Sequence, residues 1–174
     1  VQQIEFEPPS ENGRDRVRID NLLYRLNSIS HTLLALLHSD RTRDTVNKIL
    51  YEVLTMFRGD RAYIIEFDWE KRTHNCTYEV TAAGVSCEQE RLSSLSMEDF
   101  PWWTERVSKG NSIILSDIRD LPPEAAGEHG LLAAQKIKSL LIMPLASRDK
   151  VWGYAGIDIV DRRREWTDED CQWF

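Results

Sequence analysis

The sequence predicts an α+β domain whose strands pair in antiparallel hairpins. Three observations support this fold class. Apolar residues recur at helical spacing between residues 19 and 57, apolar and polar residues alternate over residues 61–80, and two almost wholly apolar segments, residues 137–147 and 150–160, flank a short polar turn. Spacings of three and four residues indicate helices, and alternation indicates strands. Helices and hairpins in separate stretches of the chain are typical of the α+β class.

The composition indicates a globular domain that does not bind nucleic acid. Of the 174 residues, 41% are hydrophobic and 29% charged, which allows a core, and the net charge of −7 disfavours phosphate binding. No apolar run approaches the roughly 20 residues that a membrane span needs. The three cysteines show no C-x-x-C spacing. We therefore expect a protein of the reducing cytoplasm, with no metal site and no membrane contact by this segment.

The first part of the chain predicts a linker and then a pairing helix. Residues 1–15 contain Pro8, Pro9 and Gly13 and are expected to be a linker or the cut edge of a longer chain. Residues 16–38 predict a signalling helix of the coiled-coil type, with an a/d heptad seam at Ile19, Leu22, Leu26, Ile29, Leu33 and Leu36. The seam favours a homodimer through paired helices. The alternative is one broad apolar face packed on the domain's own core.

A second helix and a hairpin follow. Apolar residues from Val46 to Phe57 fall on one helical face, and Gly59 marks its end. Residues 61–68 and 73–80 alternate as two strands around a polar turn, so we expect an antiparallel pair. Residues 81–98 have weak periodicity and are expected to form a long loop.

The segment DFPWWTERVSKGNSI contains two adjacent tryptophans. A proline in its first turn and a glycine at its end predict a short helix over residues 100–109. Phe100, Trp103 and Val107 share its buried face, whereas Trp102 points about 100° away. Trp102 therefore faces something other than this core, either a ligand or the outer surface.

The remaining elements are a short strand, a loose helix and a long hairpin. SIIL predicts a strand, and residues 116–135 a loop followed by a helix weakened by two glycines. The strands at 137–147 and 150–160 are apolar on nearly every residue, so both sheet faces should be covered. Gly153 and Gly156 allow something to approach the second strand closely. A capping box at Thr167–Asp170 starts a last helix, which we expect to continue in the natural protein.

With these elements in this order, the chain resembles the GAF domain, the small-molecule sensor module of signalling proteins. The resemblance covers residues 20 to 174 and lies in GDRAYIIEFD, FPWWTERVSKGNSIILSDIRDLPPEA, IKSLLIMPLASRDKVWGYAGIDIV and EWTDEDCQWF. It implies a profilin-like antiparallel sheet of five to six strands. Long N- and C-terminal helices would cover one face, and short helices and loops would roof a pocket on the other. Residues 39–174 would be the sensor domain, with its final helix truncated.

The resemblance also implies where a ligand would lie. The candidate pocket residues are Phe67, Tyr78, Trp102, Asp117, Ile118 and Ile142. Asp117 ends a strand beside the pocket roof, where a carboxylate can orient a ligand. The three acidic residues of SDIRDLPPE could bind a cation or the amine of a ligand; the alternative is that Asp120 caps the helix behind Pro122 and Glu124 favours its positive end.

Specialised members of the family carry sequence motifs that this chain lacks. Bilin-binding members use a cysteine commonly followed by histidine, but Glu88 follows Cys87 and Thr77 follows Cys76. The Asn-Lys-x-Phe-Asp-Glu mark of cyclic-nucleotide binding is absent. Of the four histidines, His129 is the one candidate haem ligand in the roof, and a solvated helix position is the alternative. We therefore expect no cofactor.

Catalysis by a thiol is disfavoured as well. Members that reduce free methionine sulfoxide use a catalytic and a resolving thiol. Here Glu79, Glu88 and Glu90 surround Cys76 and Cys87 in the sequence, and acidic neighbours raise a thiol's pKa. No other catalytic motif is present, so we expect no catalytic residue.

The sequence thus predicts a non-catalytic sensing domain of a larger cytoplasmic signal-transduction protein, a two-component sensor histidine kinase. Its partners would be an unknown small-molecule ligand, a second copy bound through the N- and C-terminal helices, and an adjoining output domain. The alternative is a structural dimerisation module whose pocket is filled by its own side chains. A cavity against Trp102, Tyr78 or Phe67 would favour the sensor.

Overall fold

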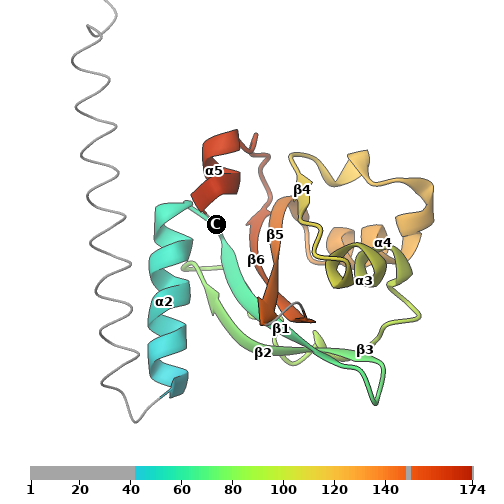
Figure 1. Ribbon diagram of the computed structural model, residues 1–174. Helices are drawn as coiled ribbons and strands as arrows, with labels where there is room; N and C mark the ends of the chain where they lie inside the picture. The colour runs from blue at the N-terminus through green and yellow to red at the C-terminus, as the bar shows by residue number, and fades with distance from the viewer. Residues whose placement is uncertain (1–41, 148–149, 174) are drawn as a thin grey trace, which may run out of the picture. The chain divides into compact units, whose positions relative to one another are not determined.

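The computed structural model describes residues 42–147 and 150–173, and contains one six-stranded sheet with helices on both faces (Figure 1). The elements are α2 (Thr42–Met56), β1 (Arg61–Asp68), β2 (Thr73–Thr81), β3 (Ser93–Ser96), α3 (Pro101–Ser108), β4 (Ile113–Leu115), η1 (Ile118–Asp120), η2 (Pro123–Ala125), α4 (Ala126–Ala134), β5 (Ile137–Ser147), β6 (Lys150–Val160) and α5 (Asp168–Trp173).

Contacts divide the chain into two units, Val1–Thr45 and Val46–Phe174. The sheet, its two covering layers and every site discussed below belong to the second unit. The predicted segments 1–15 and 16–38, with the seam from Ile19 to Leu36, lie outside the described residues, so the paired helix stays a prediction.

The sheet confirms both predicted hairpins and joins them at its centre. The strand order is β3-β2-β1-β6-β5-β4, and every neighbouring pair is antiparallel. β1 pairs with β6, so that Tyr63 lies opposite Gly156 and Ile65 opposite Tyr154. Strands from the early and late parts of the chain are therefore neighbours at the centre of the sheet.

One element was missed. Residues 81–98 were expected to form a loop, yet they contain β3, whose Leu95 pairs with His74 of β2. Its sequence, SSLS, has one apolar residue and lies at the sheet edge, so no alternation marks it. β3 extends the sheet under the roof, and it contributes directly to the site described below.

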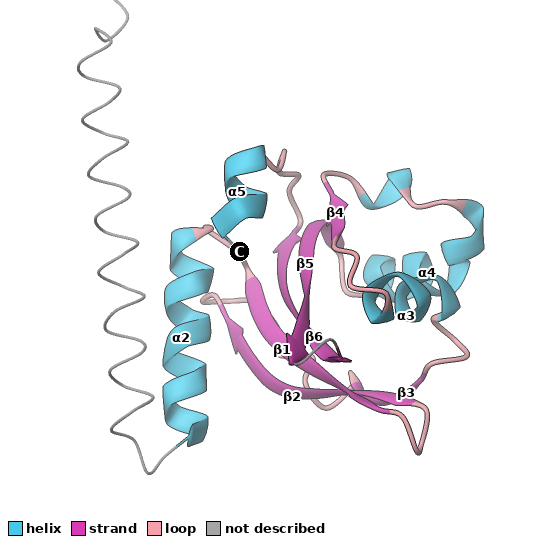
Figure 2. Ribbon diagram, in the orientation of Figure 1, coloured by secondary structure: helices cyan, strands magenta, loops and turns pink. Residues whose placement is uncertain are grey.

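The two sheet faces carry separate apolar clusters. Figure 2 shows α2 on one side of the sheet and α3 and α4 on the other. On the α2 side, Leu50, Leu54 and Phe57 pack against Ala62 of β1 and Ile157 of β6. On the other side, a larger cluster lies beneath α3 and α4. Successive residues of a strand point to opposite faces, so β1 and β6 contribute to both clusters.

The roof helices α3 and α4 are tied together at the start of α3. Phe100 supplies no side-chain cap there, and the carboxylate of Glu128 in α4 accepts the Trp103 backbone N–H at 3.0 Å instead. A Cβ on Gly127 would lie 2.3 Å from the carbonyl oxygen of Asp99, so the close approach of α4 requires glycine. One of the two glycines that weaken the helix in sequence is thus a packing requirement.

The C-terminal segment confirms the predicted capping box. Thr167 Oγ1 accepts the Asp170 N–H at 3.1 Å, and Asp170 Oδ2 accepts the Thr167 N–H at 3.0 Å. The arginines at 162–164 pair with Asp60, Asp117 and Asp170, so this local basic run is neutralised.

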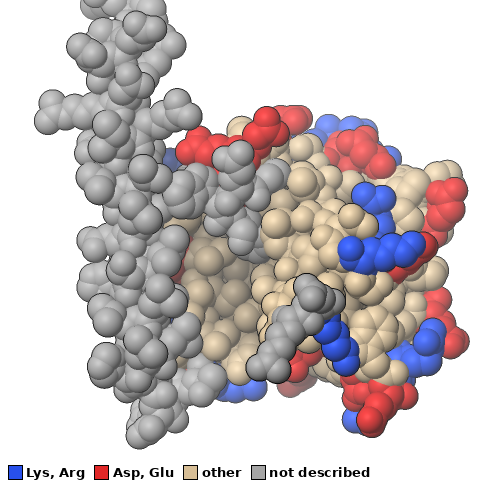
Figure 3. All heavy atoms as spheres, in the orientation of Figure 1, with Lys and Arg blue, Asp and Glu red and all other residues tan. Residues whose placement is uncertain are grey.

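The surface around the roof carries both signs of charge. On the face shown in Figure 3, acidic and basic side chains are interspersed. Among the described helices, none combines the length and the apolar character that crossing a bilayer requires.

Candidate functional site

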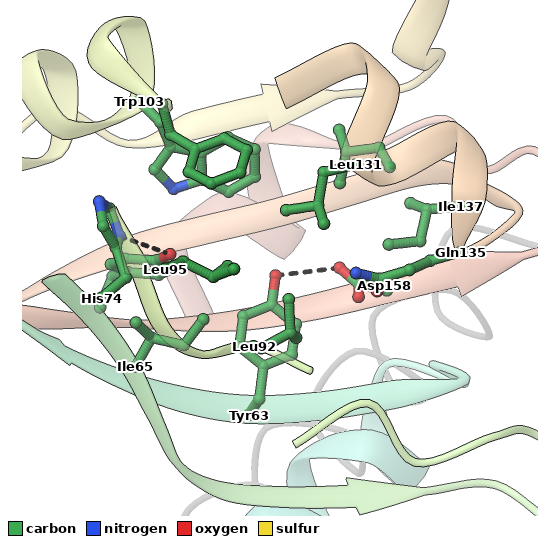
Figure 4. Close-up of a pocket in the computed structure, with 13 residues that line it drawn as sticks. Tyr63, Ile65, His74, Leu92, Leu95, Trp103, Leu131, Gln135, Ile137 and Asp158 are labelled. Carbon is green, nitrogen blue, oxygen red and sulfur yellow. Dashed lines mark hydrogen bonds between the residues drawn. The ribbon is translucent and has the colours of Figure 1, made fainter. Parts of the chain in front are cut away.

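A cavity of about 40 Å³ lies between the sheet and the roof (Figure 4). Since one water needs roughly 10–15 Å³ of such space, it has room for a few waters or a small ligand. The strands β1, β2, β3, β5 and β6, with the segment before β3, form its floor, and α3 and α4 form its ceiling. The lining residues are Tyr63, Ile65, His74, Leu92, Leu95, Phe100, Trp103, Leu131, Leu132, Gln135, Ile137, Tyr154 and Asp158.

A glycine on β6 positions the first polar group. A Cβ on Gly156 would lie 2.3 Å from Cζ of Tyr63, so the tyrosine ring rests directly against the β6 backbone. This confirms that Gly156 allows a close approach to the strand. The ring placed in this way donates its O–H to Asp158 Oδ1 at 3.0 Å.

Asp158 is a buried carboxyl group on the cavity wall. It is 2% exposed, and its second oxygen, Oδ2, lies 3.9 Å from Nη1 of Arg61, too far for a hydrogen bond. Burial raises the pKa of Asp158 to about 7, although Arg61 and the Tyr63 hydroxyl act in the opposite direction. The group is therefore costly to ionise in this state of the domain.

Arg61 lies among three carboxylates at this end of the cavity. Its side chain is 1% exposed, with Glu79 and Glu88 each at 3.7 Å and Asp158 at 3.9 Å. Nη1 also donates to the amide oxygen of Gln135 at 3.3 Å, which links this cluster to the roof. Glu79 Oε1 makes no hydrogen bond within the described residues. The single positive charge of Arg61 therefore lies close to three carboxyl groups and can balance only one of them if all three are ionised.

The opposite end of the cavity is uncharged. Thr104 donates its hydroxyl proton to the Phe100 carbonyl, so its oxygen must accept from Nε2 of His74 at 2.8 Å. Nδ1 of His74 then accepts the Tyr154 O–H at 3.3 Å. Burial lowers the pKa of His74 to about 4, so the imidazole is neutral at physiological pH. The Trp103 indole nitrogen is buried beside Tyr154 and makes no hydrogen bond in the described part of the chain.

Three of the predicted pocket residues lie in the core around the cavity. Phe67, Ile118 and Ile142 are buried in the cluster beneath the roof, and the Phe67 ring contacts His74 and Tyr154. None of the three lines the cavity itself. They support the shape of the site from behind its walls.

The other three predicted residues lie elsewhere. Trp102 lies under the guanidinium of Arg106, 4.9 Å from the ring centre, and lines a groove of about 430 Å³ on the outside of the roof. Asp117 pairs with Arg119 at 2.8 Å and Arg163 at 2.7 Å, which holds its pKa down at about 2. Asp117 caps the helical turn η1, whereas η2 and α4, which follow Pro122, begin without a side-chain cap, so the expected cap by Asp120 is not formed.

Tyr78 packs with the α2-side cluster, on the far side of the sheet. The cause is a bulge in β2, because Ile64 pairs with Tyr78 whereas the next residue, Ile65, pairs with Cys76. The extra residue, Thr77, reverses the alternation, so Cys76 faces the roof and Tyr78 faces the helices.

Sequence reasoning missed the polar groups that do line the cavity. His129 of α4 is exposed, and the histidine in the cavity is His74. Asp158 lies within the apolar run GIDIV and Arg61 at the start of a buried strand. A charged residue within a strand buried on both faces was the available signal, since such residues are almost never buried without a partner.

The thiols of Cys76 and Cys87 do not line the cavity. Burial, with Glu79 second, raises the pKa of Cys76 to about 12. The pKa of the exposed Cys87 is also raised, by desolvation and by its contact with Glu79. Both pKa values are raised, which agrees with the expectation that acidic neighbours make these thiols less reactive.

Two characterised proteins are similar in sequence. The methanogenesis regulatory histidine kinase FilI of Methanothrix harundinacea is 29% identical over 166 residues, which are 90% of this chain and 18% of that protein. The circadian input-output histidine kinase CikA of Thermosynechococcus vestitus is 30% identical over 69 residues, 40% of this chain and 10% of that protein. The chain thus spans less than a fifth of the length of these relatives.

Solved structures share the fold at low identity. The phycocyanobilin-bound GAF domain of a cyanobacterial phytochrome has a TM-score of 0.70 and 16% identity, covering 86% of both chains. The chromophore-binding domain of the Stigmatella aurantiaca bacteriophytochrome has a TM-score of 0.67 and 16% identity, covering 87% of this chain and 56% of that one. The sequence pattern of GAF domains matches residues 41–174, and the chain belongs to the GAF domain family.

Proposed function

We propose that residues 39–174 are a non-catalytic regulatory domain that senses a small molecule inside a cytoplasmic two-component sensor histidine kinase. The observation that carries the proposal is the cavity between sheet and roof, with its buried carboxyl, imidazole and indole groups. The similarity to two histidine kinases supports the kinase context. Residues 16–38 and the helix that starts at Asp168 would connect the domain to a second copy and to an output domain.

The polar groups in the cavity favour a ligand over a packing defect. Buried polar groups are normally paired, and leaving one unpaired costs roughly 1–3 kcal/mol. Here the Trp103 N–H is unpaired within the described residues, and Asp158 has one hydrogen bond for two carboxylate oxygens. A ligand or ordered water that used these groups would recover that free energy.

The size of the cavity favours a ligand much smaller than a tetrapyrrole. Several solved structures with the same fold contain a bound bilin. At about 40 Å³, the cavity of this chain has room for only a few non-hydrogen atoms, and none of its lining residues is a cysteine. A bilin would need a different roof position and a different attachment.

The second candidate is the structural dimerisation module. The observation that favours it is the same small volume, because the roof-side core around the cavity, which includes Phe67, Ile118 and Ile142, is buried and leaves only about 40 Å³. In that case the few buried polar groups would be satisfied by water alone.

Native mass spectrometry of the chain purified gently from cell extract distinguishes the two. A sensor should carry an added small-molecule mass that is lost in Leu131→Phe, which narrows the cavity. Leu121→Phe is the matched control, because Leu121 also packs at the edge of the roof-side core but does not line the cavity. A natural chain that carries no added mass in any extract would support the structural module instead.

A further inference from the structure

The charge around one end of the cavity is unbalanced. Asp158, Glu79 and Glu88 surround the single buried guanidinium of Arg61 at 3.7–3.9 Å. Arg91, which pairs with Glu88 at 3.1 Å, is 78% exposed and contributes little inside. Of the three carboxylates, Asp158 is the one that lines the cavity. When Asp158 is ionised, a balancing positive charge is therefore missing on the side of the cavity, where a ligand would lie.

The rest of the wall suits a cation, and for an anion it offers the Trp103 N–H but no free positive charge. Rings of Tyr63, Phe100, Trp103 and Tyr154 line the cavity, and aromatic faces attract cations. His74, the remaining ring, is neutral because its pKa is about 4. Arg61 is the nearest cationic group and is already engaged by carboxylates and Gln135. A carboxylate or phosphate ligand would meet Asp158 without a free positive partner.

We propose that this cavity binds a small organic cation, a primary or methylated ammonium ion of a few non-hydrogen atoms, whose charge pairs with the carboxylate of Asp158. The inference rests on the proposed sensing function and names its ligand class. The volume of about 40 Å³ sets the upper size in the present roof position. The ammonium N–H groups would donate to the carboxylate oxygen that Tyr63 leaves free, and the alkyl groups would contact the leucines of the ceiling.

Proton binding provides an independent signature. The pKa of Asp158 is about 7, so a cation that pairs with the ionised form binds more weakly as pH falls below 7. The groups facing Asp158 are Arg61, Tyr63, Glu79 and Asp60. Burial raises the pKa of Tyr63 well above 10, so this hydroxyl keeps its proton throughout.

The test is calorimetric titration of the chain at pH 8 and constant ionic strength. The probes are methylammonium and trimethylammonium chloride, with tert-butanol as the neutral analogue and acetate as the anion. We expect an ammonium ion to bind and the other two not to bind. Asp158→Asn should weaken binding at least about tenfold, the size of a lost hydrogen bond to a charged group. Asp120→Asn makes the same charge change at an exposed position and should leave the affinity unchanged.

A second measurement needs no variant. With the unaltered chain, ammonium affinity should fall about tenfold between pH 8 and pH 6. Tighter binding of tert-butanol or acetate would overturn the cation class while leaving small-molecule sensing intact. Absence of ammonium binding, or unchanged affinity in a folded Asp158→Asn variant, would also overturn it. The mass measurement described above decides separately whether the domain senses any ligand.

Discussion

Replacing Asp158 with asparagine should stabilise the unliganded domain at pH 8 and have little effect in acid. The folded domain surrounds Asp158 with low-dielectric material, while Arg61 at 3.9 Å compensates only in part. Its pKa is consequently raised from 3.8 to about 7. Asparagine has nearly the same shape and can accept the Tyr63 hydrogen bond, but it never ionises.

The sign and size of this change in folding stability follow from the linkage between proton binding and folding. Between pH 4 and pH 7 the folded state keeps a proton that the unfolded state releases, so stability falls as pH rises and levels off above 7. A pKa difference of one corresponds to about 1.4 kcal/mol. The rise from 3.8 to about 7 therefore amounts to about 4 kcal/mol lost on ionisation, of which about 3 kcal/mol falls between pH 5 and pH 8.

Urea unfolding of both chains at pH 5 and pH 8 measures this directly. All other ionisable groups are present in both proteins, so the difference between the two proteins isolates Asp158. The stability of Asp158→Asn relative to the natural chain should rise by about 3 kcal/mol between the two pH values. Asp120→Asn should show no such rise. A relative stability that is equal at both pH values would refute the reasoning, because Arg61 would then hold Asp158 ionised throughout.

Further predictions concern glycines. Gly156→Ala puts a methyl group 2.3 Å from the Tyr63 ring, so it should displace the ring, cost about 1–3 kcal/mol in chemical unfolding and change the near-ultraviolet circular dichroism of the tyrosines. Gly127→Ala should be destabilising by a similar amount, because its Cβ would meet the Asp99 carbonyl oxygen at 2.3 Å. Gly130→Ala, in the same helix with nothing within 4 Å, should stabilise by about 0.5–1 kcal/mol, and equal effects at 127 and 130 would contradict the proposed contact.

The fold could be predicted where periodicity is long and apolar. The hairpins at 61–80 and 137–160, the short helix at Pro101 and the capping box at Thr167 all appear as expected. β3 could not be predicted because a four-residue polar edge strand shows no alternation of apolar and polar residues. Its position is determined by its pairing with β2.

The site could be predicted only in part, because the sequence pattern does not show where a strand departs from regular alternation. Tyr78 and Cys76 are two residues apart and would share a face in a regular strand, yet the bulge at Thr77 separates them. Nothing in the local sequence predicts that bulge. Asp158, by contrast, was visible as a lone acid in GIDIV, and its meaning depends on Arg61, which lies 97 positions earlier and becomes its neighbour through the β1–β6 pairing.

The same pairing decides how a ligand could affect the helices. On β6, Asp158 faces the cavity while its neighbour Ile157 packs beneath α2 with Leu54 and Phe57. A Cβ on Gly59 would lie 2.7 Å from Ile157 Cγ2, so the turn after α2 rests directly on this strand with no space to absorb a shift. Pairing a cation with Asp158 would remove the cost of ionising it and favour the strand position that the pair requires. Because one peptide unit separates the two side chains, that preference would act on the α2 cluster through β6 itself.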